Sequence, residues 1–255
     1  MKNRGKRMFE PLNHKNSLKD IEYKRSEIFK QLMKASSNIN DGTTSSISTA
    51  DLRCLFELYD KIFFHNWFKS NFKGKIVFSL SKRMTKSAGL TLCPKNIDKI
   101  KSEDLVIEIR IGVDFFFHYE VLEGSKKVCG VSTYNSLHAL QLVFEHELCH
   151  VLEFIHFKES SCKKERFKTM ACNLFGHTES YHVLPTNQQI AHEKLDLHLG
   201  DMVTFIFENK KLEGVLHNIN KRGTVMVKDK KGPYKDKNGN RYAKYYVPLN
   251  LISKK

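Results

Sequence analysis

Apolar residues in the first third of the chain recur at helical spacing. Residues 17–35 show a moderate pattern of this kind, and a Ser/Thr/Asn/Gly-rich linker follows over residues 36–48. A stronger stripe then runs through Leu52, Leu55, Phe56, Tyr59, Ile62 and Phe63. Because Ser48 or Thr49 can cap this second segment, we predict a core helix that begins there, whereas the helix over 17–35 is expected to be held loosely.

Strand-like patterns follow the second helix. Residues 75–80 alternate, residues 87–92 are a second candidate, and residues 104–117 are rich in branched and aromatic side chains. Helical spacing returns from Tyr134 or Asn135 to about Phe157, and again over residues 165–175, where Gly176 ends the segment. These elements predict an α+β domain in which a long helix lies behind a small antiparallel sheet.

Short strand patterns fill the C-terminal part of the chain, at residues 203–207, 212–219, 224–227 and 242–247. They predict a small all-β barrel, with the boundary in the polar stretch 185–197. We therefore divide the chain into a basic arm, helix and linker (1–48), an α+β domain (49–184) and a β-barrel (198–255).

Composition narrows the classes of protein to consider. The 255 residues carry a net charge of +15, which indicates a polyanionic partner such as nucleic acid, or else solvated lysines that only confer solubility. The six cysteines include no CxxC pair, and no run approaches the roughly 18 apolar residues that span a bilayer. We expect reduced thiols in a soluble, intracellular protein with no membrane segment and no secretion signal.

The strongest chemical signal is the segment 145–150, which reads Glu-His-Glu-Leu-Cys-His. On a helix, His146 and His150 project from one face and can bind one zinc ion through neutral imidazole nitrogens. Glu147 is the candidate general base that takes a proton from a zinc-activated water and returns it to a leaving amine. Apolar residues at helical spacing surround the motif. The alternative is that the two histidines are structural and hydrogen-bond to carbonyls within a helical core. This interpretation gives no reason for a buried glutamate between them.

Further segments resemble the SprT-like, or Spartan-type, metalloproteases. Residues 58–64 resemble that family's helix with a double aromatic end, and residues 79–89 its strand signature, a basic-Met-Thr turn followed by Ala-Gly. Downstream, residues 166–168 and 174–178 resemble the next helix and its end. The resemblance covers about residues 51–182. It implies an α+β, zincin-like domain and a zinc-dependent endopeptidase whose substrates are proteins bound or crosslinked to DNA.

The C-terminal region is similar to the SH3-like barrel that follows some SprT-like domains, notably in viruses, phages and bacteria. The resemblance rests on residues 200–205, 214–215 and 218–221. A barrel of this type can present basic turns to nucleic acid, or it can be a packing or protein-contact module. The nucleic-acid-binding candidates are Lys221, Arg222, Lys228, Lys230 and Lys231.

A third protein ligand is required, and here the chain departs from the family. Aligning the family's aromatic residue with Phe167 places Lys163 where the family has its third histidine, and lysine is a poor ligand near neutral pH. The adjacent Cys162 offers a thiolate and is the favoured candidate. Glu165 is a close rival that would complete a set of two histidines and one glutamate.

Two histidines are weaker alternatives for the third ligand. His156 follows His150 by six positions, as in metzincins, but Glu153 occupies the place where that family needs glycine, so on a continuous helix His156 faces elsewhere. His177 lies past the next helix. It and His182 either shape the cleft or cap structure.

Two hypotheses of different classes follow. The first is a zinc metallopeptidase of SprT-like type acting on proteins at nucleic acid. The second is a nucleic-acid-binding protein whose zinc site is structural or vestigial and which has no protease turnover.

Overall fold

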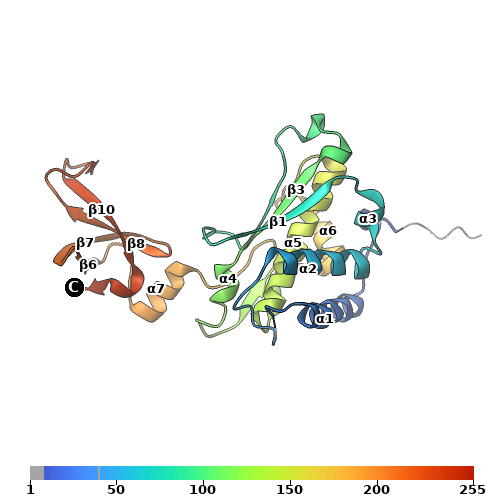
Figure 1. The fold of residues 1–255 in the computed structure, drawn as a ribbon, viewed down its shortest axis with the longest axis horizontal. Coiled ribbons are helices and arrows are strands. Elements are labelled where there is room, and N and C mark those ends of the chain that lie inside the picture. The colour runs from blue at the N-terminus through green and yellow to red at the C-terminus, as the bar shows by residue number, and fades with distance from the viewer. Residues whose placement is uncertain (1–8, 40) are drawn as a thin grey trace, which may run out of the picture. The chain divides into compact units, whose positions relative to one another are not determined.

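The computed structural model describes residues 9–39 and 41–255, and the chain separates into two units, Met1–Leu184 and Pro185–Lys255 (Figure 1). The first unit contains helices with small sheets and the second an antiparallel six-stranded sheet, which confirms the predicted α+β class. Residues 1–8 of the predicted basic arm lie outside the described residues. In the described part of the chain, no helix is long and apolar enough to cross a membrane.

Helix α1 (Leu18–Ala35) is part of the core of the first unit. Ile21, Ile28 and Leu32 are at most 2% exposed, so the prediction of a loosely held helix is wrong. The sequence pattern is misleading because Arg25 stands on the same face, at the position where an apolar residue is expected. The helix begins after Ser17, whose hydroxyl accepts a hydrogen bond from the N–H of Asp20.

The second predicted helix is confirmed as α2 (Thr49–Ile62), and the short α3 (Trp67–Asn71) follows it. Ser48 and Asp51 form a capping box, in which each side chain accepts a hydrogen bond from the other residue's backbone N–H. The apolar face of α2 buries Leu52, Leu55 and Tyr59.

The first unit contains a three-stranded sheet of β1 (Lys75–Ser81), β2 (Gly89–Leu92) and β3 (Val106–Gly112), in the order β1-β3-β2. β3 is antiparallel to β2 but parallel to β1, so the predicted all-antiparallel sheet is wrong. Alternation of side chains does not encode strand direction, and residues 82–105 form a connection long enough to return to the same end of the sheet. The predicted strand 104–117 ends early because α4 (Asp114–Phe117) follows β3.

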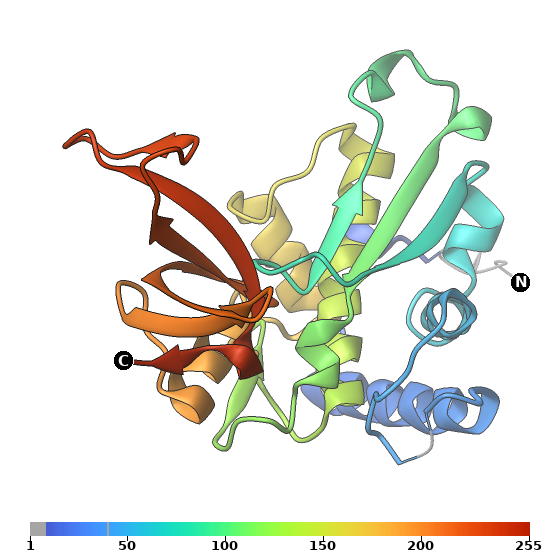
Figure 2. The same cartoon turned by 60° about the vertical axis from the view of Figure 1, so that its left-hand side comes forward.

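Helix α5 (Ser136–Phe157) runs behind the sheet, as the two views in Figures 1 and 2 show, and α6 (Glu165–Phe175) packs beside it. Ile107, Ile109 and Ile111 of β3 are fully buried on the helix side. α6 ends as predicted at Gly176, whose φ of 67° favours glycine. A hairpin of β4 (Lys126–Val128) and β5 (Val131–Thr133) precedes α5.

The second unit begins with α7 (Asn187–Leu195), which lies in the stretch predicted as a polar boundary. Only Ala191 of this helix is buried, so its sequence has little helical periodicity to detect. The sheet has the order β11-β6-β7-β8-β10-β9. Its strands are β6 (Met202–Phe207), β7 (Lys210–Ile219), β8 (Arg222–Lys228), β9 (Tyr234–Lys235), β10 (Arg241–Pro248) and β11 (Ser253–Lys254). The four predicted strands correspond to β6, β7, β8 and β10.

Candidate metal centre

Helix α5 carries the predicted motif through the core of the first unit. Most of its residues are buried, including Leu140, Phe144 and Leu148, and a helix that is apolar on nearly all sides is stable only inside protein. It begins after Asn135, whose side-chain oxygen accepts a hydrogen bond from the N–H of His138. It ends at Lys158, where a φ of 58° turns the chain back along the helix.

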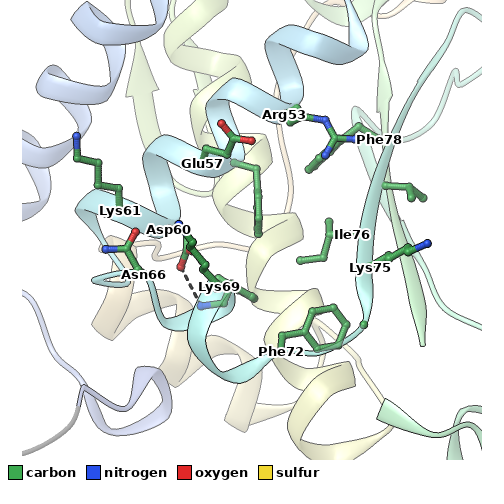
Figure 3. A pocket seen from close by; sticks show the side chains of 14 residues that line it. Arg53, Glu57, Asp60, Lys61, Asn66, Lys69, Phe72, Lys75, Ile76 and Phe78 are labelled. Carbon is green, nitrogen blue, oxygen red and sulfur yellow. Dashed lines mark hydrogen bonds between the residues drawn. The ribbon is translucent and has the colours of Figure 1, made fainter. Parts of the chain in front are cut away.

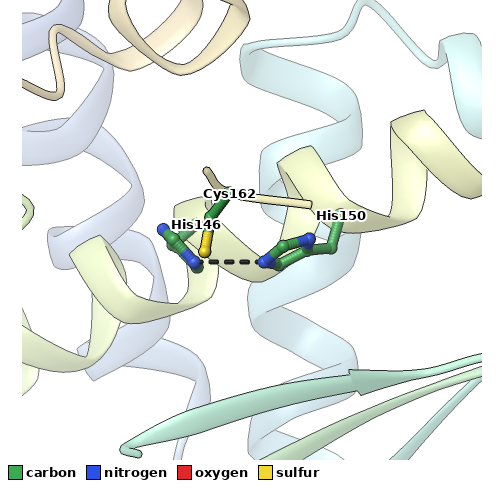
Figure 4. Close-up of side chains that lie close together, drawn as sticks. All are labelled: His146, His150 and Cys162. Atoms are coloured by element: carbon green, nitrogen blue, oxygen red, sulfur yellow. Dashed lines mark hydrogen bonds between the residues drawn. The ribbon is translucent and has the colours of Figure 1, made fainter. Parts of the chain in front are cut away.

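His146 and His150 project from one face of α5, and Cys162 from the following loop completes a group of three (Figure 4). One ligand atom from each residue lies within 4.8 Å of the other two. Ligand atoms of a tetrahedral zinc ion, bound at about 2.0–2.3 Å, are roughly 3–4 Å from one another. The cluster can therefore hold a metal ion.

Hydrogen bonds determine the tautomer of His150. The hydroxyl of Ser160 donates its single proton to Oε2 of Glu153 at 2.7 Å, so it accepts a hydrogen bond from Nδ1 of His150 at 2.6 Å. Nε2 of His150 then carries a lone pair and faces Nε2 of His146 at 3.1 Å. Two ring nitrogens at this distance need a proton or a metal ion between them, which fits a metal site.

The environment of both histidines favours neutral rings. Burial lowers the pKa of His146 to about 2, with further contributions from neighbouring histidines, and burial lowers the pKa of His150 to about 4. Within the described residues, no hydrogen bond joins either ring to a carbonyl: Nδ1 of His146 lies 3.7 Å from Sγ of Cys129, Nδ1 of His150 faces Ser160, and the two Nε2 atoms face each other. The alternative of two histidines satisfied by carbonyls therefore does not hold. The ring of Phe167 packs against both imidazoles.

Glu153 holds the loop that carries Cys162. This fully buried carboxylate accepts hydrogen bonds from Ser160 Oγ, from the backbone N–H of Ser161 at 2.9 Å and from Nε of Arg166 at 2.7 Å. It thus joins α5, the loop and α6, and it supports His150 through Ser160. The glutamate that departs from the metzincin pattern is a central contact of this site.

Glu147 lies between the two histidines in sequence and points toward β2. Burial raises its pKa to about 7, although a hydrogen bond from Oγ1 of Thr91 to its Oε2 at 2.7 Å acts in the opposite direction. Gly89 leaves the space that this carboxylate occupies, since a Cβ at residue 89 would collide with the Glu147 side chain. A glutamate with such a pKa can accept and release a proton near neutral pH.

Glu145 has a separate, structural set of contacts. Its carboxylate accepts hydrogen bonds from Nε of Arg25 at 2.7 Å and from the hydroxyl of Tyr59 at 2.8 Å, and Nε2 of His177 lies 2.8 Å away. Burial alone would raise the pKa of Glu145, but the charge of Arg25 and the hydrogen bonds from His177 and Arg25 lower it to about 2. The network ties α1 and the end of α6 to the helix that carries the metal cluster.

The other candidates for the third ligand lie outside the cluster. Glu165 is exposed at the start of α6, His156 stacks on Trp67, and His177 is bound to Glu145. His182 accepts a hydrogen bond from the N–H of Ala88, beside β2, and its ring contacts Phe115. Within the described residues, His146, His150 and Cys162 are the only group with metal-binding geometry.

The five basic candidates of the second unit are all exposed, but the structure divides them between the two ends of β8. Lys221 and Arg222 lie at its start and Lys228 at its end, with Lys230 and Lys231 in the turn that follows. β9 and β10 bring Lys235, Arg241 and Lys244 beside the second group. Nζ of Lys244 lies 4.0 Å from the centre of the Tyr234 ring.

Comparisons with known proteins identify no relative of this chain. No protein-family model, curated protein or solved structure matches the chain.

Several residues around the site were not recognised in the sequence. Cys129, Ser160 and Thr91 come from three different elements, and no local pattern connects them with the motif. A signal did exist for Gly89, which belongs to the Ala-Gly pair of the family resemblance, and for Glu153, a charged residue on an apolar helix.

Proposed function

We propose that this protein is a zinc-dependent endopeptidase of SprT-like type that cleaves proteins bound or crosslinked to DNA. The observation that carries the proposal is the pairing of a cluster of three ligand atoms within 4.8 Å with a buried carboxylate, Glu147, on the same helix. A structural zinc site has no need of such a carboxylate.

His146, His150 and Cys162 would hold the ion, which when bound polarises a peptide carbonyl and lowers the pKa of water. Glu147 accepts the proton of the attacking water, and Thr91 holds its carboxylate in position. With a pKa of about 7, Glu147 then protonates the amine that leaves when the peptide bond breaks. The contacts of Ser160 and Cys129 orient the two histidines during these steps.

Two features of the fold support the family part of the proposal. The motif helix lies behind a small sheet, and β2 of that sheet contacts Glu147, an arrangement consistent with a zincin-like domain. In this proposal the antiparallel sheet of the second unit corresponds to the SH3-like barrel.

The test compares the wild type with Glu147→Gln. We expect both proteins to bind one zinc ion, measured by atomic absorption, and the variant to lose at least about 100-fold in cleavage of a histone-like protein bound to DNA. Glu159→Gln, which changes an exposed carboxylate near the same site, should cleave like the wild type. Equal cleavage by the Glu147→Gln variant would show that Glu147 is not the general base.

The nucleic-acid part of the proposal rests on charge. Residues 221–244 contain nine lysines and arginines against two aspartates. We expect replacement of Lys228, Lys230 and Lys231 by glutamate to weaken binding to duplex DNA and to flatten its salt dependence, by about 0.9 in log-log slope for each lost phosphate contact. A salt dependence identical to that of the wild type would remove this group from the interface.

The second candidate function is nucleic-acid binding with a structural or vestigial zinc site. A cysteine ligand favours it, because thiolates are the usual ligands of structural zinc. This candidate predicts bound zinc and salt-sensitive DNA binding with no cleavage by the wild type.

A further inference from the structure

A large cavity of the first unit lies away from the metal cluster, between α2, α3 and β1 (Figure 3). It measures about 820 Å³, and a second cavity of about 360 Å³ continues it toward the start of α2. The two share Arg53, Glu57, Val77 and Phe78 in their walls. We call this combined space the β1 groove. No residue of the metal cluster lines it.

One wall of the β1 groove is the edge of a sheet. Strand β1 is the terminal strand in the order β1-β3-β2, and it contributes four successive residues, Lys75 to Phe78, to the lining. Side chains of successive residues lie on opposite faces of a strand, so a space lined by all of them borders its edge.

The hydrogen-bonding direction of each β1 residue follows from the ladder with β3. The N–H of Lys75 donates to the carbonyl of Leu105 at 2.8 Å, on the β3 side. Because backbone groups alternate in direction along a strand, Ile76 and Phe78 turn their N–H and C=O groups toward the groove. Across residues 9–39 and 41–255, no strand pairs with this edge. An edge of this kind is a template for an added strand.

Side chains of the groove define what such a strand must carry. Phe56, Phe72 and Ile76 are half-buried in its walls and offer an apolar surface. Four cations surround that surface, namely Arg53, Lys61, Lys69 and Lys75, and all are exposed. None of the four forms an ion pair with a described carboxylate.

The acidic residues of the groove only partly balance these cations. Asp60 is buried, and its carboxylate accepts hydrogen bonds from the backbone N–H groups of Phe68 and Lys69 at 2.9 and 3.1 Å. Only Glu57 presents an exposed carboxylate to the groove. The charge therefore complements an acidic occupant.

We propose that the β1 groove is a docking site for an extended acidic segment of a partner protein, which adds as a strand to the free edge of β1. Its backbone pairs with Ile76 and Phe78, alternate apolar side chains contact the aromatic wall, and the acidic side chains between them approach Lys69 and Lys75. The site is independent of the metal cluster and of the proposed peptidase activity.

The probe is a fluorescein-labelled heptapeptide, Asp-Phe-Glu-Val-Asp-Phe-Glu, with fluorescence anisotropy as the readout. The full chain carries Glu147→Gln, so that the probe survives whether or not the protein is a peptidase. We expect the probe to bind at least about tenfold more tightly than a peptide with lysine at its acidic positions. Two further peptides carry methyl groups on alternate backbone nitrogens, one on the odd and one on the even positions. Only one of them should lose binding, because only one set of N–H groups pairs with β1.

Two groove variants and one matched control locate the binding. Lys69→Glu with Lys75→Glu should weaken binding at least about fivefold, whereas Lys19→Glu with Lys30→Glu, the same charge change on exposed positions of α1, should leave it unchanged. Ile76→Pro removes one N–H from the free edge without breaking the ladder with β3. It should lower the affinity for the probe about fivefold. Equal binding by all variants, or no binding up to millimolar protein, would overturn the proposal.

Discussion

The carboxylate of Glu153 accepts a hydrogen bond from the hydroxyl of Ser160 at 2.7 Å, and this contact supports both sides of the metal cluster. Through Ser160 it orients His150, and through the backbone of Ser161 it holds the loop that carries Cys162. In zinc proteins, outer contacts of this kind are worth about 10–100-fold in metal affinity.

We therefore expect Glu153→Gln to lower zinc affinity by about 10–100-fold, because a neutral amide cannot accept from Ser160, Ser161 and Arg166 together. Competition with a chromophoric chelator measures this affinity, and thermal unfolding in a chelator separates it from a general loss of stability. Glu159→Gln is the control, since Glu159 also contacts Arg166 but is exposed. Unchanged zinc affinity in Glu153→Gln would contradict the supporting role.

Replacement of Cys162 tests the third ligand. Serine is close in size but binds zinc poorly, so Cys162→Ser should lower zinc affinity by at least about 100-fold, whereas Cys162→His should retain most of it. In the cobalt-loaded protein, the near-ultraviolet charge-transfer band of a thiolate ligand should disappear in both variants. Cys172→Ser, at an exposed cysteine, should keep that band. If the band persists in Cys162→Ser, the thiolate ligand must be another cysteine.

The salt bridge between Arg25 and Glu145 should contribute to the stability of the first unit. Arg25→Met leaves the fully buried Glu145 without its cation, which we expect to lower the free energy of unfolding by about 3–5 kcal/mol in urea titrations. Lys19→Met, an exposed change on the same helix, should alter it by less than about 0.5 kcal/mol. A similar small effect for Arg25→Met would mean that α1 is not coupled to α5 through this pair.

The capping residue Asp51 should give the protein part of its acid sensitivity. Burial raises the pKa of Asp51, but hydrogen bonds from Ser36, Ser48 and Asn38 outweigh it and lower the pKa below 3.8. A depressed pKa means that the stabilisation is present above about pH 4 and is lost as the pH falls through the folded-state pKa.

Asp51→Asn should therefore be less stable by about 1 kcal/mol at neutral pH, and the difference from the wild type should shrink below pH 4. Urea unfolding at several pH values measures both quantities. Asp98→Asn, at an exposed position, provides the comparison. A difference that stays constant down to pH 2 would exclude the carboxylate as its cause.

Local patterns predicted much of the fold. The helical spacing of α2, α5 and α6, the cap at Ser48 and the stop at Gly176 depend on neighbouring residues, and the structure agrees with each. The parallel pairing of β1 with β3 depends on contacts across more than twenty residues, for which alternation carries no information. The burial of α1 was missed because Arg25 looks polar in sequence, while its charge is satisfied by Glu145.

The sequence by itself determined that His146, Glu147 and His150 share one helix, because apolar residues recur at helical spacing around them. The four-residue spacing then places the two histidines on one face of that helix. Tertiary structure decided which residue completes the cluster. Cys162, Glu165, His156 and His177 were all candidates from the sequence, and the chain reversal at Lys158, held by Glu153, brings a sulfur beside the two rings. The β1 groove is likewise invisible in the sequence, since a strand edge is free only when no other strand pairs with it.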